Sequence, residues 1–396
     1  MRIVINDYAG LTFPLELSKE LSKRGHRVTH TFTQSCGISP MSNEENYEQK
    51  IHFVNIDSCR VKKDNLIKRW FQERKYGKLA VKELAGFSPD VIISGNTPLI
   101  AQKKIINWAN INGIPAIFWL QDLLSIAAKT ILSDVNKAIG TIMYRYFGSI
   151  EIDALRKANH IIAITEDFLP FLKQWNIDTD KVSFIPNWGP IEKIPVINRR
   201  NKFSIKYELN DKFVVLYSGT LGKKQDIKLI AETAEKLADD NEIIFIVATD
   251  KRGHNLFKQH LAKNDYPNLL KIPLQNVSIY PYLLASSDVA LVTLAATAGM
   301  YCAPSKLWSI YCAKKPAIVA VDKGNLCARI TESINAGIVT APGSVNECIA
   351  AIRELKENKS LRLSMGMNAR EYAEKYFPIS KIGDAFETII QNVMNK

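Results

Sequence analysis

Residues 301–322, YCAPSKLWSIYCAKKPAIVAVD, hold the strongest candidate anion site of the chain. Apolar residues at i, i+3 and i+4 predict a short helix after Pro304, and the run AIVAV behind it predicts a buried strand. Ser305 can cap the free backbone N–H groups at the helix start, and Lys306 adds a full positive charge beside them. We therefore expect a phosphorylated ligand at Ser305 and Lys306, although an ordinary helix-strand unit fits the same residues.

A second candidate lies in the loop 218–224, which follows a strand predicted at 213–217. Gly219 frees the backbone to approach a phosphate, and Lys224 supplies charge. Two anion-binding points in one half of the chain suit a diphosphate better than a single phosphate. The six histidines form no H-E-x-x-H cluster, so we expect neither a metal site nor a bound cofactor. No G-x-S-x-G nucleophile motif is present either.

The elements that would carry these loops alternate between strand and helix. In the first half we predict strands at 2–6, 28–32, 90–94, 116–120, 160–164 and 182–185. In the second half they fall at 213–217, 243–248, 269–272, 289–294, 317–321 and 338–339. This alternation predicts two doubly wound α/β domains facing each other across a cleft, at 1–190 and 213–375. The polar, aperiodic stretch 191–212 is predicted to be a linker.

Polar residues follow several predicted strands of the first domain. Gly10 stands in the first strand-helix turn, Asn96 follows the third strand, and Asp122 follows the fourth. Because the carboxyl ends of parallel strands line the ligand crevice of an open sheet, we expect these residues beside a ligand. The apolar stretch 138–147 either covers an amphiphilic substrate or packs in the core.

Composition describes a globular protein, with 46% hydrophobic and 23% charged residues among 396. The six cysteines are scattered without a C-x-x-C pair, which favours a reducing compartment over a disulfide framework or a zinc site. The N-terminus MRIVINDYAG enters a strand directly and lacks the apolar region of a signal peptide. No apolar run reaches the roughly 18 residues of a spanning helix, so we expect a cytoplasmic protein that is not integral to a membrane.

Positive charge is concentrated between residues 60 and 82, which hold nine basic and two acidic residues of a chain with a formal net charge of +12. Aromatic side chains are interleaved with these charges, as in a helix that lies on an anionic membrane surface. The residues expected at the membrane or at an acceptor there are Lys68, Arg69, Trp70, Phe71, Arg74 and Lys75. A solvated basic face is the simpler alternative. Nucleic acid would also suit the charge, but no nucleic-acid motif accompanies it, so no nucleic-acid partner is expected.

Motifs along nearly the whole chain resemble those of family 4 glycosyltransferases of the GT-B fold, in the branch that makes bacterial capsule, O-antigen and exopolysaccharide. These motifs are NDYAG, QERKYG with SPDVIISGNTPL, FWLQD, IPNW, YSGTLGKKQ and PSKLWSIYCAKKP. The resemblance implies transfer of a sugar from a nucleotide diphosphate donor, commonly a uridine diphosphate sugar, with retention at the anomeric carbon and without a metal. The donor would lie on residues 200–375 and the acceptor on 1–190, with the last helix, 376–396, packed back on the first domain.

Carried over residue by residue, the resemblance implies a donor site formed by Gly10, Gly219, Leu221, Lys224, Leu274, Ser305, Lys306 and Ser309. In that site the turn 274–277 would face the base through its backbone. Lys224 and Lys306 would stabilise the charge that develops on the leaving diphosphate, and Asp122 would lie beside the transferred sugar. These three residues are our candidates for catalysis.

The chain departs from the family pattern at three positions. Gln121 stands where many relatives carry a histidine near the transferred sugar. Tyr301 and Ser309 stand where many carry two glutamates, the second of which grips the ribose. A serine can still hydrogen-bond a hydroxyl, but more weakly than a carboxylate does.

Two other functions remain compatible with the sequence. A nucleotide-sugar epimerase of the same fold would need neither a lipid acceptor nor a basic surface helix. A two-domain protein that closes on a ligand without chemistry is the other, but proteins of that layout are often exported. With transfer as the reaction, the expected acceptor is a lipid-diphosphate-linked saccharide at the inner face of the cytoplasmic membrane, to which the basic helix would bind peripherally.

Overall fold

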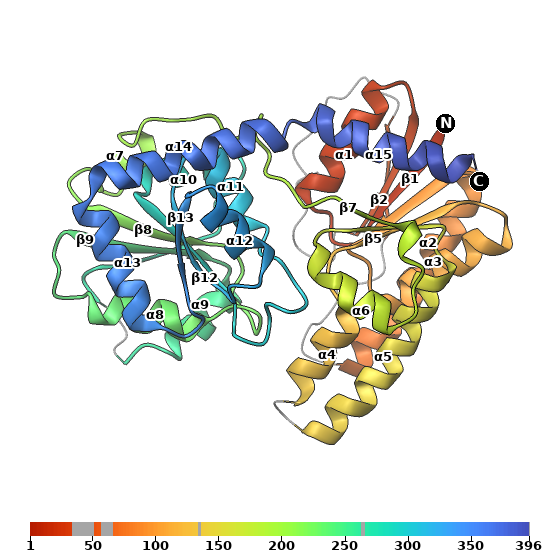
Figure 1. Ribbon diagram of the computed structural model, residues 1–396, viewed down its shortest axis with the longest axis horizontal. Helices are drawn as coiled ribbons and strands as arrows, with labels where there is room; N and C mark the ends of the chain where they lie inside the picture. The colour runs from red at the N-terminus through yellow and green to blue at the C-terminus, as the bar shows by residue number, and fades with distance from the viewer. Residues whose placement is uncertain (34–50, 57–65, 134–135, 263–265, 396) are drawn as a thin grey trace. The chain divides into compact units, whose positions relative to one another are not determined.

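The protein folds into two compact units in this computed structural model (Figure 1), which describes residues 1–33, 51–56, 66–133, 136–262 and 266–395. Unit 1 comprises Met1–Pro186 and Ile379–Lys396, and unit 2 comprises Asn187–Pro378. Each unit holds one parallel sheet of its own, which confirms the predicted pair of doubly wound α/β domains. Residues 34–50, which the polar sequence predicts to form a loop, and the first residues of the basic segment, 60–65, lie outside the described residues.

The sheet of unit 1 has the strand order β3-β2-β1-β4-β5-β6-β7, and all neighbouring strands are parallel. Its central strands are apolar runs buried on both faces, as expected for a sheet covered by helices on each side. The strands are β1 (Arg2–Asp7), β2 (Arg27–Phe32), β3 (Ile51–Asn55), β4 (Val91–Gly95), β5 (Ala116–Leu120), β6 (His160–Ala163) and β7 (Val182–Phe184). Strand β3 was absent from the sequence prediction, because only five residues with one or two apolar positions on each face mark it.

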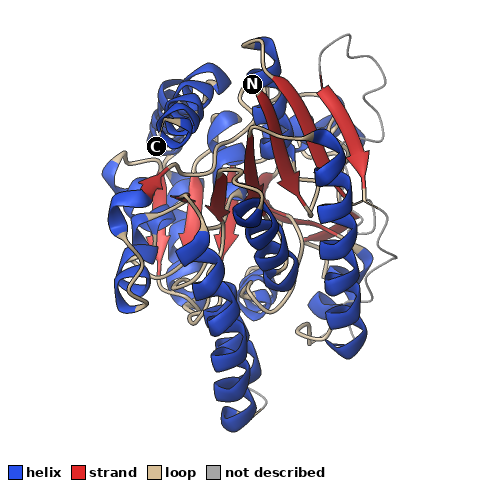
Figure 2. Cartoon of the chain, turned by 90° about the vertical axis from the view of Figure 1, so that its right-hand side faces the viewer, coloured by secondary structure: helices blue, strands red, loops and turns tan. Residues whose placement is uncertain are grey.

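Helices connect these strands in the right order for a doubly wound sheet, and Figure 2 shows the helices and strands of the chain in different colours. The helices of unit 1 are α1 (Thr12–Lys23), α2 (Leu66–Phe87), α3 (Leu99–Ile111), α4 (Leu124–Ser133), α5 (Lys137–Lys157), α6 (Leu169–Gln174) and α15 (Ile379–Met394). In both Figure 1 and Figure 2, the paired helices α4 and α5 extend past the strands. None of the described helices is long and apolar enough to cross a membrane.

Helix α15 is held on α1 of unit 1 by a cluster of ion pairs. The Arg24 guanidinium lies 2.7 Å from Asp384 and 2.9 Å from Glu387. It also donates to the Ser380 carbonyl at 2.6 Å. Gly383 permits this close approach, because a Cβ there would lie 2.8 Å from the guanidinium. The helix after Pro378 therefore packs on the first unit, although it follows the second unit in the sequence.

The sheet of unit 2 has the strand order β10-β9-β8-β11-β12-β13, again parallel throughout. Its strands are β8 (Phe213–Ser218), β9 (Ile243–Thr249), β10 (Leu269–Pro273), β11 (Val289–Thr293), β12 (Ala317–Ala320) and β13 (Gly337–Thr340). Its helices are α7 (Lys202–Lys206), α8 (Ile227–Lys236), α9 (Lys251–Lys258), α10 (Tyr280–Ser286), α11 (Lys306–Cys312), α12 (Leu326–Ser333), α13 (Val345–Glu357) and α14 (Lys359–Tyr376).

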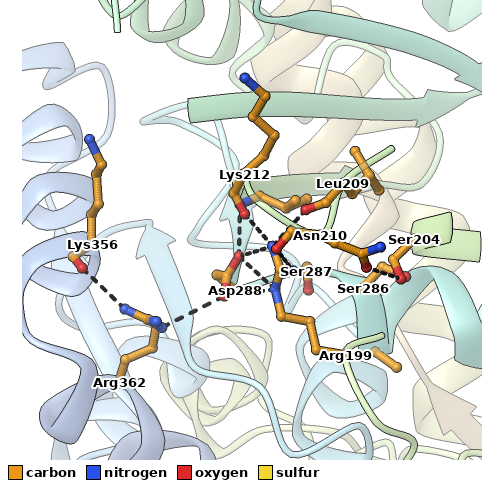
Figure 3. Close-up of polar contacts among 12 residues, drawn as sticks. Arg199, Ser204, Leu209, Asn210, Lys212, Ser286, Ser287, Asp288, Lys356 and Arg362 are labelled. Carbon is orange, nitrogen blue, oxygen red and sulfur yellow. Dashed lines mark hydrogen bonds and ion pairs between the residues drawn. The ribbon is translucent and has the colours of Figure 1, made fainter. Parts of the chain in front are cut away.

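The stretch 191–212, predicted to be a linker, is an ordered part of unit 2. Arg199 grips the Asp288 carboxylate at the start of β11 with three hydrogen bonds of 2.9–3.1 Å (Figure 3). The same guanidinium donates to the carbonyls of Leu209 and Asn210, so it fixes the turn that leads into β8. The linker prediction missed this attachment because it depends on Asp288, which lies 89 residues away in the sequence.

Candidate functional site

The strand order of unit 2 reverses between β8 and β11, and open α/β sheets bind ligands at the carboxyl ends of the strands at such a point. Gly219 follows β8 with a φ of 144°, a conformation that side chains rarely adopt. A Cβ at this position would lie 3.1 Å from the Lys306 ammonium, so glycine allows the lysine to lie directly against the loop. The two anion-binding candidates of the sequence, at Gly219 and Lys306, are therefore brought together.

Lys306 is held by a single aromatic residue of β8. Its ammonium donates to the Tyr217 hydroxyl at 2.6 Å and lies 3.9 Å from the centroid of the same ring. Part of the lysine side chain reaches the surface, yet its ammonium is enclosed, and this desolvation lowers the pKa of Lys306 to about 7. The group therefore carries an incomplete charge at neutral pH, and an anion beside it would restore the full charge.

Lys224 ends the same loop and lies over a second tyrosine. Its ammonium is 5.6 Å from the centroid of the Tyr301 ring, which is buried. The Lys224 carbonyl accepts from the backbone N–H of Ala295 at 2.8 Å, which ties the loop to the segment after β11. The 219–224 loop thus has one lysine against its first residue and another at its last.

The predicted serine cap of α11 is wrong. Ser305 has helical backbone angles, φ −62° and ψ −17°, and its side chain makes no capping hydrogen bond. A capping residue needs an extended backbone to turn its side chain toward the free N–H groups, and the turn that starts at Pro304 prevents this. Ser305 is exposed, so its hydroxyl faces solvent at the start of the helix.

Ser309 is half-buried, and its hydroxyl hydrogen-bonds the Tyr280 side chain. Burial raises the pKa of Tyr280 to about 12, and the hydrogen bond with Ser309 opposes that rise. The position of the expected ribose carboxylate is therefore filled by a pair of hydroxyls from α10 and α11.

Two other residues predicted to bind the donor sugar nucleotide, Leu221 and Leu274, already make contacts within unit 2. The Leu221 side chain is buried in the hydrophobic core of unit 2, so only its backbone can face a ligand. Leu274 is exposed, but its backbone N–H donates to the Thr249 carbonyl at 3.1 Å. A contact of Leu274 with a base would therefore use its carbonyl or side chain.

A pocket of about 240 Å³ lies at the carboxyl edge of the unit 1 sheet. It occupies the point where the strand order reverses between β1 and β4, the place where open α/β sheets bind ligands. The residues that line it are Tyr8, Ala9, Asn96, Thr97, Pro98, Leu99, Phe118, Trp119, Gln121, Asp122, Leu124 and Glu151. Asp122 is therefore in the pocket, whereas Gly10 closes the turn beside it with a φ of 64°.

Glu151, which the sequence analysis did not single out, is the buried carboxylate of this pocket. It accepts from the backbone N–H groups of Leu124 and Ser125 at 2.9 and 3.0 Å, and from the Ser125 hydroxyl. Burial, with Asp122 nearby, raises the pKa of Glu151 to about 7 against the effect of these hydrogen bonds. Glu151 thus holds the start of α4 while lining the pocket.

Asp7 is a buried residue at the end of β1, directly before Tyr8 and Ala9 of the pocket lining. Its carboxylate accepts from the backbone N–H of Leu11 at 2.6 Å and of Ala9 at 3.3 Å, which shapes the turn that contains Gly10. Burial raises the pKa of Asp7 to about 7, and the hydrogen bonds from the Leu11 and Ala9 backbone partly counteract this rise. Asn96 has a φ of 48°, an uncommon conformation for a residue with a side chain.

The basic helix α2 is amphipathic in a different way from that predicted. Trp70 turns inward, where it packs on a small apolar cluster and donates to the Tyr146 hydroxyl at 3.0 Å. Phe71 is 63% exposed, and Arg74 and Lys75 are exposed beside it. The side chains of Lys68 and Arg69 lie outside the described part of the structure.

The apolar stretch 138–147 forms part of α5 and is only partly packed. Ile139 and Ile142 are 48% and 64% exposed, whereas Gly140 is buried against Ser133 of α4. Packing in the core therefore does not account for the whole stretch. Among the residues with described placement, no group of three His, Cys, Asp or Glu side chains is positioned to hold a metal ion.

Two family profiles match this chain in sequence. The profile for Glycosyltransferase Family 4 matches residues 12–192, and the profile for Glycosyl transferases group 1 matches residues 198–372. A curated relative, named as the colanic acid biosynthesis glycosyl transferase WcaI of Escherichia coli (strain K12), is 23% identical over 296 residues. These cover 73% of this chain and 70% of the relative.

Solved structures share the fold over the full chain. Sucrose-phosphate synthase from Thermosynechococcus elongatus superposes with a TM-score of 0.75 at 12% identity, covering 100% of this chain and 99% of that one. Anabaena HepE in complex with UDP-glucose superposes with a TM-score of 0.72 at 15% identity, covering 100% of both chains.

Proposed function

The chain belongs to the family 4 glycosyltransferases of the GT-B fold, and from this premise we propose the reaction that its two sites perform. We propose that it transfers a sugar from a nucleotide diphosphate donor, a UDP-sugar, to a lipid-linked or saccharide acceptor in cell-surface polysaccharide biosynthesis. Transfer proceeds with retention at the anomeric carbon and without a metal. The names of its relatives support the pathway and the donor, since one is named for colanic acid biosynthesis and another was solved with UDP-glucose.

The observation that carries the proposal is the enclosed Lys306 ammonium at the Gly219 turn. Burial lowers the pKa of Lys306 to about 7, so its charged form is poorly stabilised in the free protein. An anion bound beside the ammonium would stabilise that charged form. The donor diphosphate binds there, with Lys224 at the other end of the loop. As the bond to the sugar breaks, both ammonium groups stabilise the charge that develops on the leaving diphosphate.

The acceptor binds unit 1, and its lipid part requires a membrane nearby. Helix α2 presents Phe71, Arg74 and Lys75 to solvent, a combination that favours an anionic surface. We place the protein in the cytoplasm, peripherally at the inner face of the cytoplasmic membrane. Flotation with anionic liposomes tests this part separately: binding falls as salt increases, and salt-independent or absent binding contradicts it.

A ligand screen followed by product analysis tests the reaction. Thermal unfolding is measured with nucleoside diphosphates and their sugars, because a ligand of the native state raises the unfolding temperature. The donor found in this way is then incubated with and without a lipid-linked saccharide. Release of the nucleoside diphosphate that depends on the acceptor supports transfer. Interconversion of the free donor would identify an epimerase, and binding without any product would identify a non-catalytic binding protein.

A further inference from the structure

Exposed apolar side chains gather on one face of α5, in the helix pair α4 and α5 that extends past the strands (Figure 1, Figure 2). Ile139, Ile142 and Tyr146 are all exposed, and their spacing of three and four residues places them on the same face of the helix. A contiguous patch of exposed apolar side chains usually marks an interaction surface. This face of α5 is therefore suited to a partner that accepts apolar groups.

The same face continues onto α2 through contacts of Trp70. The Trp70 indole N–H donates to the Tyr146 hydroxyl at 3.0 Å. The exposed Phe71 ring packs edge-on against the Trp70 ring, with the two centroids 4.9 Å apart. The Arg74 guanidinium lies 4.4 Å from the centroid of the Trp70 ring. We call the resulting surface the α5–α2 strip, which consists of Ile139, Ile142, Tyr146, Trp70, Phe71 and Arg74.

Positive charge gathers at the α2 end of this strip. Lys104 of α3 lies against α2 at Gly77, where a Cβ would be 3.0 Å from the Lys104 Cδ. Burial lowers the pKa of Lys104, and the charges of Lys78 and Arg74 lower it further. These three cations are therefore close enough to repel one another, and an anion bound among them would relieve the repulsion.

The α5–α2 strip changes from apolar through aromatic to cationic, which is the order of a lipid bilayer from its acyl chains to its phosphates. Ile139 and Tyr146 are about 10 Å apart along the helix, comparable with the depth of roughly 5–10 Å at which interfacial helices bury apolar side chains. Tyrosine and tryptophan are enriched at headgroup level, and basic residues attract anionic lipids. Residues 124–150 include three basic residues and one acid, so the helix pair is itself basic. A second copy of the chain would instead bring the same cations together.

We propose that the tip of α5 enters the lipid bilayer, with Ile139 and Ile142 among the acyl chains. The aromatic part of the strip lies at headgroup level, and the three cations at its α2 end bind lipid phosphates. This inference rests on the proposed function, which brings a basic helix to an anionic membrane surface, and it adds that a second element penetrates that surface. Penetration by α5 fixes the depth and the direction of unit 1 at the membrane, which attraction by charge alone does not.

Glutamine substitutions at the tip of α5 test the penetration. Binding of the full chain is measured by flotation with vesicles of phosphatidylethanolamine and phosphatidylglycerol at a ratio of about 3:1. Ile139→Gln combined with Ile142→Gln binds these vesicles at least about tenfold more weakly than wild type, because two side chains no longer bury apolar surface. Ile111→Gln is the matched control, since this isoleucine is 84% exposed at the end of α3, outside the strip, and its binding stays within about twofold.

A second pair of substitutions tests the cationic end. Arg74→Gln combined with Lys78→Gln weakens binding to the same vesicles by at least about tenfold and makes it less sensitive to salt. Lys228→Gln combined with Lys258→Gln removes two exposed lysines of unit 2 and leaves binding within about twofold. Thermal unfolding of each variant verifies that it is folded.

Vesicle binding by the Ile139→Gln and Ile142→Gln variant at wild-type affinity overturns the inference. Equal losses in Ile111→Gln, unchanged binding without Arg74 and Lys78, or absence of binding by wild type overturn it as well. The oligomeric state without lipid is measured by analytical ultracentrifugation. A wild-type dimer that the two glutamines at the tip of α5 convert to a monomer would assign the strip to a second copy of the chain and would also overturn the inference.

The proposed function is monitored in the same samples by the thermal shift that UDP-glucose produces. If this shift persists while the vesicle results fail, only the membrane inference is wrong. If the vesicles bind as described and the shift is absent, the proposed donor is wrong.

Discussion

The reversal point of each sheet in this protein is a candidate ligand site, and the charged residues described at the two points have opposite sign. In unit 1 the reversal lies between β1 and β4 and is lined by Asp122 and Glu151. In unit 2 it lies between β8 and β11, where Lys224 and Lys306 are the charged residues. The strands around both points follow the same order, so the backbone alone does not distinguish them. The difference teaches that the fold supplies the location and the side chains supply the chemistry.

Burial shifts the pKa values of the two sites in opposite directions but brings both close to neutral pH. It raises the pKa of Glu151 to about 7 and lowers the pKa of Lys306 to about 7, because a desolvated site disfavours whichever form is charged. Each site is thus poised to change its charge near neutral pH. The carboxylate of Glu151 accepts hydrogen bonds from the backbone at the start of α4, whereas the ammonium of Lys306 donates to the hydroxyl of Tyr217.

The largest expected effect comes from removing the positive charge of the unit 2 site. Lys306→Ala is expected to lower turnover by about 10²–10³-fold, because the leaving diphosphate loses its enclosed cation. Acceptor-dependent release of nucleoside diphosphate measures the effect. Lys228→Ala is the control, since this lysine is exposed on α8 and pairs only with Glu232 in the described structure. A rate for Lys306→Ala within about threefold of wild type would show that the basic site is not catalytic.

The acidic site is tested through stability. Glu151→Ala removes the acceptor of two backbone N–H groups at the start of α4, and leaving such groups unsatisfied costs roughly 2–3 kcal/mol. Urea unfolding at neutral pH gives the free energy of unfolding. Asp153→Ala, which breaks only half-exposed ion pairs, should cost less than about 1 kcal/mol. Equal losses for both variants would contradict a structural role that is special to Glu151.

The smallest expected effect is a change in donor affinity with pH. Lys306 has a lowered pKa, so the free protein loses this charge as pH rises through about 7, and the lysine must regain a proton when the diphosphate binds. The dissociation constant of UDP-glucose is therefore expected to rise about fivefold from about pH 7 to about pH 8. Calorimetry measures this dependence. In Lys306→Arg the side chain stays charged, and the increase should disappear. The same increase in both proteins would assign it to another group.

The fold and part of each candidate site can be predicted from the sequence. Continuous apolar runs such as β4 and β5 are detectable because both faces of their strands are buried, and Gly219 is detectable because a turn after a strand needs its backbone freedom. The family resemblance is confirmed by the matches of its profiles to both halves of the chain. The donor-site residues that it implies remain predictions.

What the sequence did not predict depends on contacts between distant residues. Tyr217 holds Lys306 across 89 positions, and Glu151 reaches Leu124 across 27, so no local pattern marks either residue. A strand that ends in Tyr-Ser-Gly beside a lysine-bearing helix was the available signal for Tyr217. The cap at Ser305 was predicted from residue type alone and was wrong, because backbone geometry decides capping.

The clamp between α1 and α15 has a consequence for how the protein is made. The ribosome completes Arg24 early but Asp384 and Glu387 only after all of unit 2, so the emerging first unit lacks its last helix throughout that time. Trp119, whose ring packs 4.9 Å from Phe386 in the finished protein, has no such cover on the nascent chain. Unit 2 is one contiguous segment, whereas unit 1 gains the cover of α15 only after unit 2 has been synthesised.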